Sequence, residues 1–340
     1  MTVRARALLS AVSIVLLSGS VATSAAIVSR AQSRHEIVAT IPTGPSAAGL
    51  AFAQRTGFLY VTNVFGDNVS VIDPRTRSVV DTVPLVGGFT CAHPFGIGYD
   101  KKHDVVYVAC QQFFDLTAID ARTNTRIGDP IEVGSSPFGI VYDQRNGDVY
   151  VAIAHTDEVV VLDADTRTVS DRIPVGVAPF GIAFDTRRGY LYVTNSQADT
   201  VSVIDGATNT VVRTIPLAAG PLPAGLSPMG IVYDGRNDTV YTANFGNDTI
   251  SAIDAATGRL VSTIPVARAP FGLCLNPRDG KLYAATFLGS SVEVIDPDTN
   301  VVVESVPIGE GAVSVAADPR TGDVYVTHGN AVSVLHARPG

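Results

Sequence analysis

The sequence predicts an all-β protein, a seven-bladed β-propeller of four-stranded antiparallel blades, and three observations lead to this prediction. A motif with the pattern Tyr-Val-Thr-Asn…Val-Ser-Val-Ile-Asp recurs every 42 to 49 residues along the 340-residue chain. Each copy contains short apolar stretches separated by turn residues, without a helical period. The two chain ends complement each other as parts of one blade. The copies begin at Tyr60, Tyr107, Tyr150, Tyr192, Tyr241, Tyr283 and Tyr325.

The copy over residues 136–176 shows the four strands of one blade in order. Its first strand is expected at Pro137–Tyr142, and a tight turn rich in Asp, Asn and Gly follows it. The second strand is expected at Val149–Ala152, and a loop leads to the third at Val159–Leu162. After another turn, the fourth strand is expected at Thr168–Val175. Four such strands, rich in Val, Ile and Tyr, form an antiparallel meander.

The chain ends predict how the ring closes. Residues His35–Pro42 (HEIVATIP) match the fourth strand of another copy, Asn209–Pro216 (NTVVRTIP). The last copy ends at its third strand, Val332–His336. We therefore expect the N-terminal strand to complete the last blade, which removes the exposed edges of an open array. The chain has no Trp, which excludes WD-type repeats.

Three segments of the repeat are similar to the YVTN family of β-propellers, namely Tyr192–Asn195, Val201–Asp205 and Pro179–Ile182. The resemblance covers roughly residues 35–337, although Thr-Asn is complete only in the first and fourth copies. It implies export to the cell surface or medium and a binding or scaffold role. The fold is shared with lactonase-like propellers and quinoprotein subunits, so the resemblance does not exclude catalysis. The matching motif is structural and transfers no catalytic residue.

The N-terminus is typical of an export signal. Two arginines precede an apolar stretch at residues 7–17, and small residues follow at 21–26. The sequence thus predicts a signal peptide over residues 1–26, a short linker over 27–34 and one propeller domain over 35–337. An uncleaved membrane anchor is the alternative for the first segment, because its uncharged stretch is long enough to span a bilayer. A secreted, extracellular or cell-surface location follows from either interpretation.

The charge of the chain argues against one class of partner. The net charge is −8 and only 16% of residues are charged. Since nucleic-acid binding depends on cations that neutralise phosphates, we expect no nucleic-acid partner. Contact with a membrane is expected only through an uncleaved N-terminal segment.

Cys91 and Cys110 depart from the repeat and lie at the same end of the first two strands of the second copy. In an oxidising compartment we expect them to form a disulfide. A metal or redox site formed with His93 is one alternative, since copper prefers such ligands. Two unpaired thiols are the other alternative. Cys274, within a first strand, is expected to act as a small buried hydrophobe.

Candidate ligand-binding residues are expected on the face that gathers the second-to-third loops and the fourth-to-first connections. Irregular loops on a rigid scaffold often carry recognition. The asparagines are alternatively structural residues that bond the adjacent loop backbone, and the histidines are alternatively ordinary polar loop residues. The polar candidates are His93, Gln112, His155, Asn195, Asn244 and His328.

Aromatic side chains recur between the Pro and the Gly of successive first strands. They pack neighbouring blades together or form a hydrophobic collar at the channel mouth, which would suit an apolar or flat ligand. Aspartates that end the third strands are expected to cap turn amides, one in each blade. The aromatic candidates are Phe95, Phe138, Phe180 and Phe271, with Met229 in the fifth copy.

These observations favour an exported, non-catalytic propeller that binds or scaffolds an unknown protein or small-molecule ligand at the channel mouth. The chain contains no G-x-S-x-G, H-E-x-x-H or glycine-rich phosphate loop. No catalytic residue, cofactor or metal is predicted, but the sequence does not decide the enzyme question. The alternatives are a lactonase- or lyase-like enzyme at the channel mouth and a redox subunit that serves a quinone or metal centre.

Overall fold

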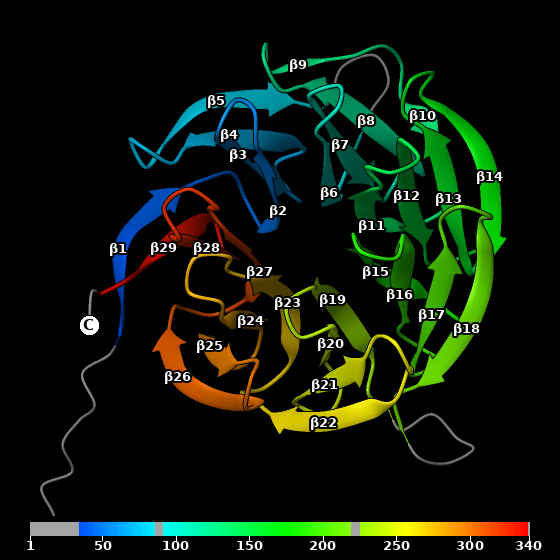
Figure 1. Ribbon diagram of the computed structural model, residues 1–340. Helices are drawn as coiled ribbons and strands as arrows, with labels where there is room; N and C mark the ends of the chain where they lie inside the picture. The colour runs from blue at the N-terminus through cyan, green and yellow to red at the C-terminus, as the bar shows by residue number, and fades with distance from the viewer. Residues whose placement is uncertain (1–33, 86–90, 219–224, 339–340) are drawn as a thin grey trace, which may run out of the picture. The chain divides into compact units, whose positions relative to one another are not determined.

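The computed structural model describes residues 34–85, 91–218 and 225–338, and it forms a seven-bladed β-propeller (Figure 1). The seven sheets follow one another around a central channel, as predicted. The described part of the chain contains no helix, and therefore none that is long and apolar enough to cross a bilayer. The expected signal peptide and nearly all of the expected linker lie outside the described residues, as do residues 87–90 and 219–224 of the two enlarged connections.

Each strand has a fixed place between the channel and the rim. The innermost strands are β2 (Ala47–Ala53), β6 (Pro94–Asp100), β11 (Pro137–Tyr142), β15 (Pro179–Asp185), β19 (Pro228–Asp234), β23 (Pro270–Leu275) and β27 (Ala312–Ala317). The second strands are β3 (Phe58–Asn63), β7 (Val105–Cys110), β12 (Asp148–Ile153), β16 (Tyr190–Asn195), β20 (Thr239–Asn244), β24 (Leu282–Thr286) and β28 (Val324–His328).

The outer half of each blade completes the meander. The third strands are β4 (Asn68–Asp73), β8 (Asp115–Asp120), β13 (Glu158–Asp163), β17 (Thr200–Asp205), β21 (Thr249–Asp254), β25 (Ser291–Asp296) and β29 (Ala331–Ala337). The outermost strands are β5 (Ser78–Pro84), β14 (Thr168–Pro174), β18 (Thr210–Pro216), β22 (Leu260–Pro265), β26 (Val301–Pro307) and β1 (His35–Pro42), with the short pair β9 (Thr125–Arg126) and β10 (Ile131–Glu132) in the second blade.

The predicted closure by the N-terminal strand is confirmed. β1 pairs antiparallel with β29, from His35 opposite Ala337 to Pro42 opposite Ala331. The His35 ring also joins this blade to the sixth: Nε2 lies 2.7 Å from the Tyr283 hydroxyl, and Nδ1 lies 2.7 Å from a Glu304 carboxylate oxygen. The last blade therefore contains strands from both ends of the chain.

The second blade departs from the expected single fourth strand. Its outer edge is divided into β9 and β10, which both pair with β8. The interruption contains Gly128, whose φ is +65°, and Pro130, which has no backbone N–H to donate. Both residues disfavour a continuous strand, which explains why the edge is divided.

The repeated motif joins each blade to the next. Its seven tyrosines are fully buried between blades. The Tyr60 hydroxyl donates to the carbonyl of Ala121 in the next blade, at 3.1 Å. Where the motif has threonine, the hydroxyl also donates forward: Thr194 Oγ1 lies 2.7 Å from the carbonyl oxygen of Met229. The motif is therefore a set of structural contacts between blades.

The ring has two faces of different construction. The mouth face carries the second-to-third loops and the fourth-to-first connections. The turn face carries the tight turns between first and second and between third and fourth strands. On the turn face, the predicted capping is confirmed: the carboxylates that end six third strands accept turn N–H groups. These are Asp73, Asp120, Asp163, Asp205, Asp254 and Asp296.

Candidate functional site

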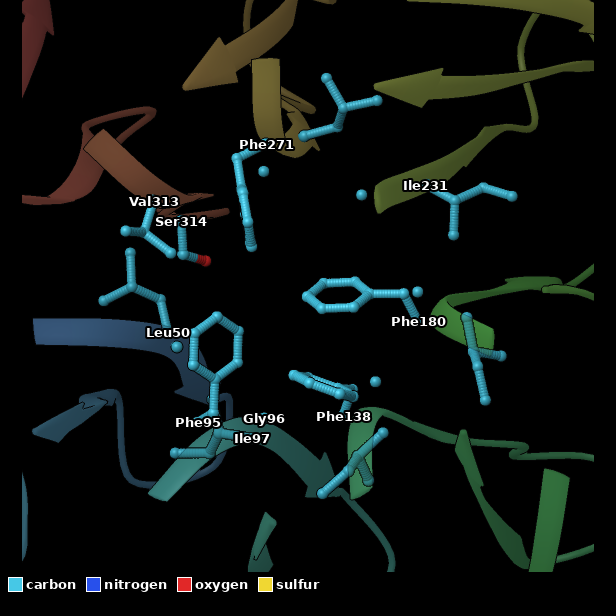
Figure 2. Close-up of a pocket in the computed structure, with 18 of the residues that line it drawn as sticks. Leu50, Phe95, Gly96, Ile97, Phe138, Phe180, Ile231, Phe271, Val313 and Ser314 are labelled. Carbon is cyan, nitrogen blue, oxygen red and sulfur yellow. The ribbon is translucent and has the colours of Figure 1, made fainter. Parts of the chain in front are cut away.

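An axial cavity of about 280 Å³ lies at the centre of the ring, and every residue that lines it belongs to an innermost strand (Figure 2). The strands contribute residues in three tiers. Phenylalanines form the tier nearest the mouth face, glycines the next, and Leu, Ile or Val side chains the deepest. The cavity is therefore enclosed almost entirely by apolar groups.

The phenylalanine rings meet across the channel, as a hydrophobic collar would. Phe138 and Phe180, from adjacent blades, have ring centroids 4.4 Å apart. Phe95 and Phe271 come from the second and sixth blades and are 6.0 Å apart. Contacts of this length add to the stabilisation by burial. The four rings form the aromatic part of the wall in Figure 2.

The glycine tier exists because adjacent innermost strands approach very closely. A Cβ atom on Gly139 would lie 2.5 Å from the carbonyl oxygen of Phe180, and one on Gly272 would lie 2.5 Å from that of Val313. Each of the six glycines in this tier faces the backbone of the next blade in the same way. The channel is narrow for this reason.

The collar is incomplete on one side. Where four blades place Phe and the fifth places Met, the seventh blade has Val313 and the first has Ala48. A second hollow of about 730 Å³ opens on the mouth face beside these two blades. Its apolar wall includes Phe65, Phe287 and Leu288. Val313 lines both hollows, so they adjoin at the gap in the collar.

Few polar side chains line this region. Ser314 is the only polar side chain among the residues that line the axial cavity, and it occupies the place of glycine in the other six copies (Figure 2). Glu310 is the only ionisable residue that lines the mouth hollow. Ser46, Ser290 and Asn330 complete its polar edge.

Exposed apolar side chains gather on the mouth face as well. Phe65 is 72% exposed and Leu288 is 54% exposed. Those large exposed hydrophobic side chains of the described residues that are not on the mouth face all lie on outermost strands. Clusters of this kind on a soluble domain are typical of recognition surfaces. The mouth-face members are Phe65, Phe113, Phe114, Val177, Phe287 and Leu288.

His93, Gln112 and His155 lie in loops of the mouth face, and His328 is the last residue of β28. His93, Gln112 and His155 are exposed, and His155 Nδ1 lies 2.8 Å from Ser135 Oγ. His328 is half-buried, with Nε2 2.8 Å from Ser333 Oγ, and burial lowers its pKa. The three imidazoles do not form a metal-ligand cluster with one another.

Asn195 and Asn244 are buried inside their blades. The Asn195 amide nitrogen donates to the Thr200 and Ser202 hydroxyls at 2.9 Å, and its oxygen accepts the Gly176 N–H. Asn244 donates in the same way to the third strand of its own blade. The structure therefore uses both amides internally and points neither into the axial cavity.

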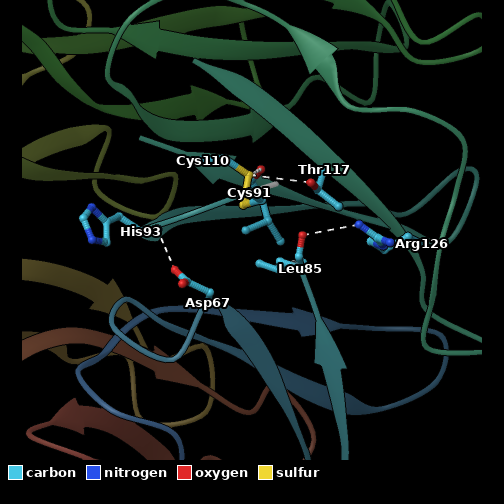
Figure 3. The surroundings of a disulfide bond; sticks show 8 residues. Asp67, Leu85, Cys91, His93, Cys110, Thr117 and Arg126 are labelled. Carbon is cyan, nitrogen blue, oxygen red and sulfur yellow. Dashed lines mark hydrogen bonds between the residues drawn. A yellow bond between two sulfur atoms is a disulfide. The ribbon is translucent and has the colours of Figure 1, made fainter. Parts of the chain in front are cut away.

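The predicted Cys91–Cys110 disulfide is confirmed, with the two Cα atoms 4.9 Å apart (Figure 3). Both cysteines are fully buried. A carboxylate oxygen of Asp115 lies within 4.8 Å of both sulfur atoms, and among the described residues this is the one group of three potential metal-ligand residues with atoms that close together. Since the sulfurs are bonded to each other, they are not available as thiolate ligands. Cys274 is a free cysteine on β23.

Asp115 itself is a buried carboxyl group that the sequence analysis missed. Its Oδ1 atom has no hydrogen-bond partner among the described residues. Burial raises the pKa of this carboxyl to about 6. Third strands in other copies begin with Asn68, Thr200 or Thr249, but the one in the third copy begins with the acidic Glu158. An acidic residue at this position therefore did not single out Asp115 in the sequence.

The mouth hollow and its gap at Val313 were also missed. Their signal was present in the seventh copy, where Val-Ser-Val replaces the usual Phe-Gly-Ile. Small side chains in place of large ones leave space, but a repeat pattern alone does not show where that space lies.

Comparison with known proteins supports the fold. No protein-family model matches the chain, and no curated protein sequence matches it. Among solved structures, the chain is similar to Kuenenia stuttgartiensis hydrazine synthase, with a TM-score of 0.74 and 19% sequence identity over 86% of this chain and 95% of that one. At this identity the likeness shows a common propeller architecture and nothing about chemistry.

Proposed function

We propose that this chain is an exported, non-catalytic β-propeller of the YVTN type that recognises an apolar ligand or partner through its mouth face. One observation carries the proposal: the exposed phenylalanines and the mouth hollow occur on the face where the copies diverge, and the axial cavity adjoins that hollow at Val313. The rest of the repeat forms contacts between neighbouring blades, so no ligand is needed to explain it.

The composition of the hollows favours binding over catalysis. General acid–base catalysis needs a positioned group that exchanges protons with the reacting molecule. The axial cavity has no ionisable side chain in its wall, and the mouth hollow has Glu310 alone. A lactonase- or lyase-like reaction would require more such groups at the same place. The redox alternative depended on Cys91 and Cys110, which are buried and bonded to each other.

Two features support export. Disulfides persist mainly in oxidising compartments, and this chain contains one. The first 26 residues also have the composition of a signal peptide. The scarcity of cations on the mouth face agrees with a partner that is not a nucleic acid.

The proposal can be tested with single-tryptophan reporters, because the chain has no tryptophan of its own. Leu288→Trp puts the reporter on the mouth face, and Val261→Trp puts it on an outermost strand at nearly equal exposure, 54% against 57%. Two small fluorescent probes are titrated: neutral N-phenylnaphthylamine and anionic anilinonaphthalene sulfonate. We expect at least one probe to change the Leu288→Trp emission saturably and to leave Val261→Trp unchanged. Equal responses at both positions, or none at either, would contradict a mouth-face recognition surface.

A further inference from the structure

We infer that the mouth hollow and the axial cavity together form one binding site for a small molecule that has a flat apolar body and no negative charge, and that enters over the seventh and first blades. This inference rests on the proposed function and specifies its ligand. It follows from three properties of the described residues: the gap in the collar, the chemistry of the walls and the position of the single charge.

The gap in the collar determines where a ligand enters. In the second, third, fourth and sixth blades, a phenylalanine ring blocks entry to the channel from the mouth face. These rings belong to Phe95, Phe138, Phe180 and Phe271. The seventh blade places the much smaller Val313 at the same position, and Val313 is only half-buried. The larger hollow opens at this side and shares Val313 with the axial cavity. A molecule on the mouth face therefore reaches the axis past Val313.

The walls determine the shape and polarity of the ligand. Beyond Val313, a guest meets phenylalanine rings, glycine backbone and aliphatic side chains. Flat rings pack well against aromatic faces and edges at such spacings. Ser314 provides one hydroxyl group in this wall, enough for one hydrogen bond to a ligand oxygen or nitrogen (Figure 2). The mouth hollow of about 730 Å³ is within the range of small-molecule sites, about 300–1,000 Å³.

Glu310 determines the charge that the site admits. It is exposed at the edge of the mouth hollow and is the only ionisable residue in the lining of either hollow. Arg268 is also in a mouth-face connection but lines neither hollow. An anion that enters past Glu310 would lose its water next to a like charge, and no lining cation would compensate for that loss. The site should therefore favour neutral molecules over anions of equal shape.

A small molecule fits these observations better than a protein segment. The axial cavity, whose wall includes the collar phenylalanines, measures only about 280 Å³. A folded partner could cover the mouth hollow but could not place its backbone beside the Gly tier, where strands already approach within contact distance. An occupant of both hollows must therefore be thin.

Neutral N-phenylnaphthylamine and anionic anilinonaphthalene sulfonate test this inference, because they share one ring skeleton and differ by a sulfonate. We expect the neutral probe to bind the purified protein at one site, with a dissociation constant about tenfold or more below that of the anion. Glu310→Gln should reduce this preference. Val313→Phe restores the residue found in four other copies, so it should preserve folding, close the gap and abolish probe binding.

Val261→Phe is the matched control, since it adds the same side chain on an outermost strand and should leave probe affinity unchanged. Equal affinity for the two probes, or full binding by Val313→Phe, would overturn the inference. If the Leu288→Trp reporter still responds in either case, the mouth face remains a recognition surface and only the deep site is excluded. If neither probe binds the protein, both proposals fail together. Binding of the neutral probe to the rim alone, unaffected by Val313→Phe, would favour a protein partner.

Discussion

The mouth face and the turn face are built from the same seven repeats, yet their chemistry differs. Of the ion pairs between described residues, Arg172–Glu158 lies near the mouth, whereas most of the others join turns on the opposite face. The mouth face has the exposed phenylalanines and the hollows instead. Identical repeats therefore do not impose identical surfaces.

The difference shows which parts of a repeat are constrained. On the turn face, an aspartate caps nearly every turn, so the copies remain alike. On the mouth face, the loops conserve one contact, in which a loop aspartate accepts an N–H group from the next connection. Four copies show it, through Asp67, Asp157, Asp199 and Asp248. The other loop positions differ among the copies and can carry side chains that bind a ligand.

The largest expected effect is a difference in stability loss between two glycine-to-alanine substitutions, one below the mouth face and one on the turn face. Gly139→Ala should destabilise the fold by about 3 kcal/mol, because its Cβ would lie 2.5 Å from the Phe180 carbonyl oxygen in a rigid wall. Gly235→Ala, in an exposed turn, places its Cβ 3.5 Å from the nearest atom and should change stability by less than about 0.5 kcal/mol. Urea unfolding measures both. Equal losses would show that the two faces tolerate added volume alike.

The disulfide gives the next effect and concerns the mouth face only. The bond closes a loop with a sequence separation of 19, and replacing both cysteines by alanine should cost about 3 kcal/mol on the chain-entropy model. Thermal unfolding should show this loss in the double variant. High salt should act on the other face, where ion pairs contribute at most about 1 kcal/mol each and are screened.

If the cysteine variant unfolds at the wild-type temperature, the mouth face does not depend on its covalent link. If high salt lowers the thermal unfolding midpoint of the wild type more than removal of the disulfide does, the comparison between the two faces is reversed.

The smallest expected effect is a pH dependence of opposite sign on the two faces. Burial raises the pKa of Asp115 to about 6, above the unfolded value of about 3.9. Its contribution to stability is therefore fully present below pH 3.9 and is lost as pH rises through 6. On the turn face, hydrogen bonds from Arg188 lower the pKa of Asp238 to about 2, so its contribution is present above pH 3.9 and is lost as pH falls towards 2.

Substitution with asparagine separates the two carboxyl groups. Asp115→Asn should stabilise the protein at pH 7 by on the order of 1–2 kcal/mol relative to pH 4. Asp238→Asn should destabilise it at pH 7, with a smaller loss at pH 3. Denaturant unfolding at these pH values measures both effects. If the effect of Asp115→Asn did not depend on pH, burial would not disfavour the ionised form of this carboxyl group.

The repeat made the architecture predictable, and local departures from it made the site partly predictable. His35–Pro42 matched a fourth strand in sequence, so ring closure could be inferred from pattern alone. Cys91 and Cys110 interrupted the motif at adjacent strand ends, which located the disulfide. The phenylalanines between Pro and Gly indicated a collar as one of two interpretations, and ring contacts across the axis agree with it.

Other features depend on three-dimensional detail that a pattern does not contain. Asn195 and Asn244 occupy loop-proximal positions, but which way an amide points is decided by hydroxyl groups on the neighbouring strand. The mouth hollow borders Val313, where four other copies have Phe, and a single copy does not reveal it. The division into β9 and β10 results from Gly128 and Pro130 acting on one edge, where the repeat predicted a continuous strand.

The pairing of β1 with β29 has a consequence for the order of assembly. Thr40 and Ser333 are neighbours across this pair, although 293 residues separate them along the chain. Of the described strands, β1 is therefore synthesised first and pairs only with the one synthesised last, and contacts of such long range slow folding. The other six sheets are each formed by strands that follow one another in the chain, so closing the ring is the one step of blade assembly that must await the last strand.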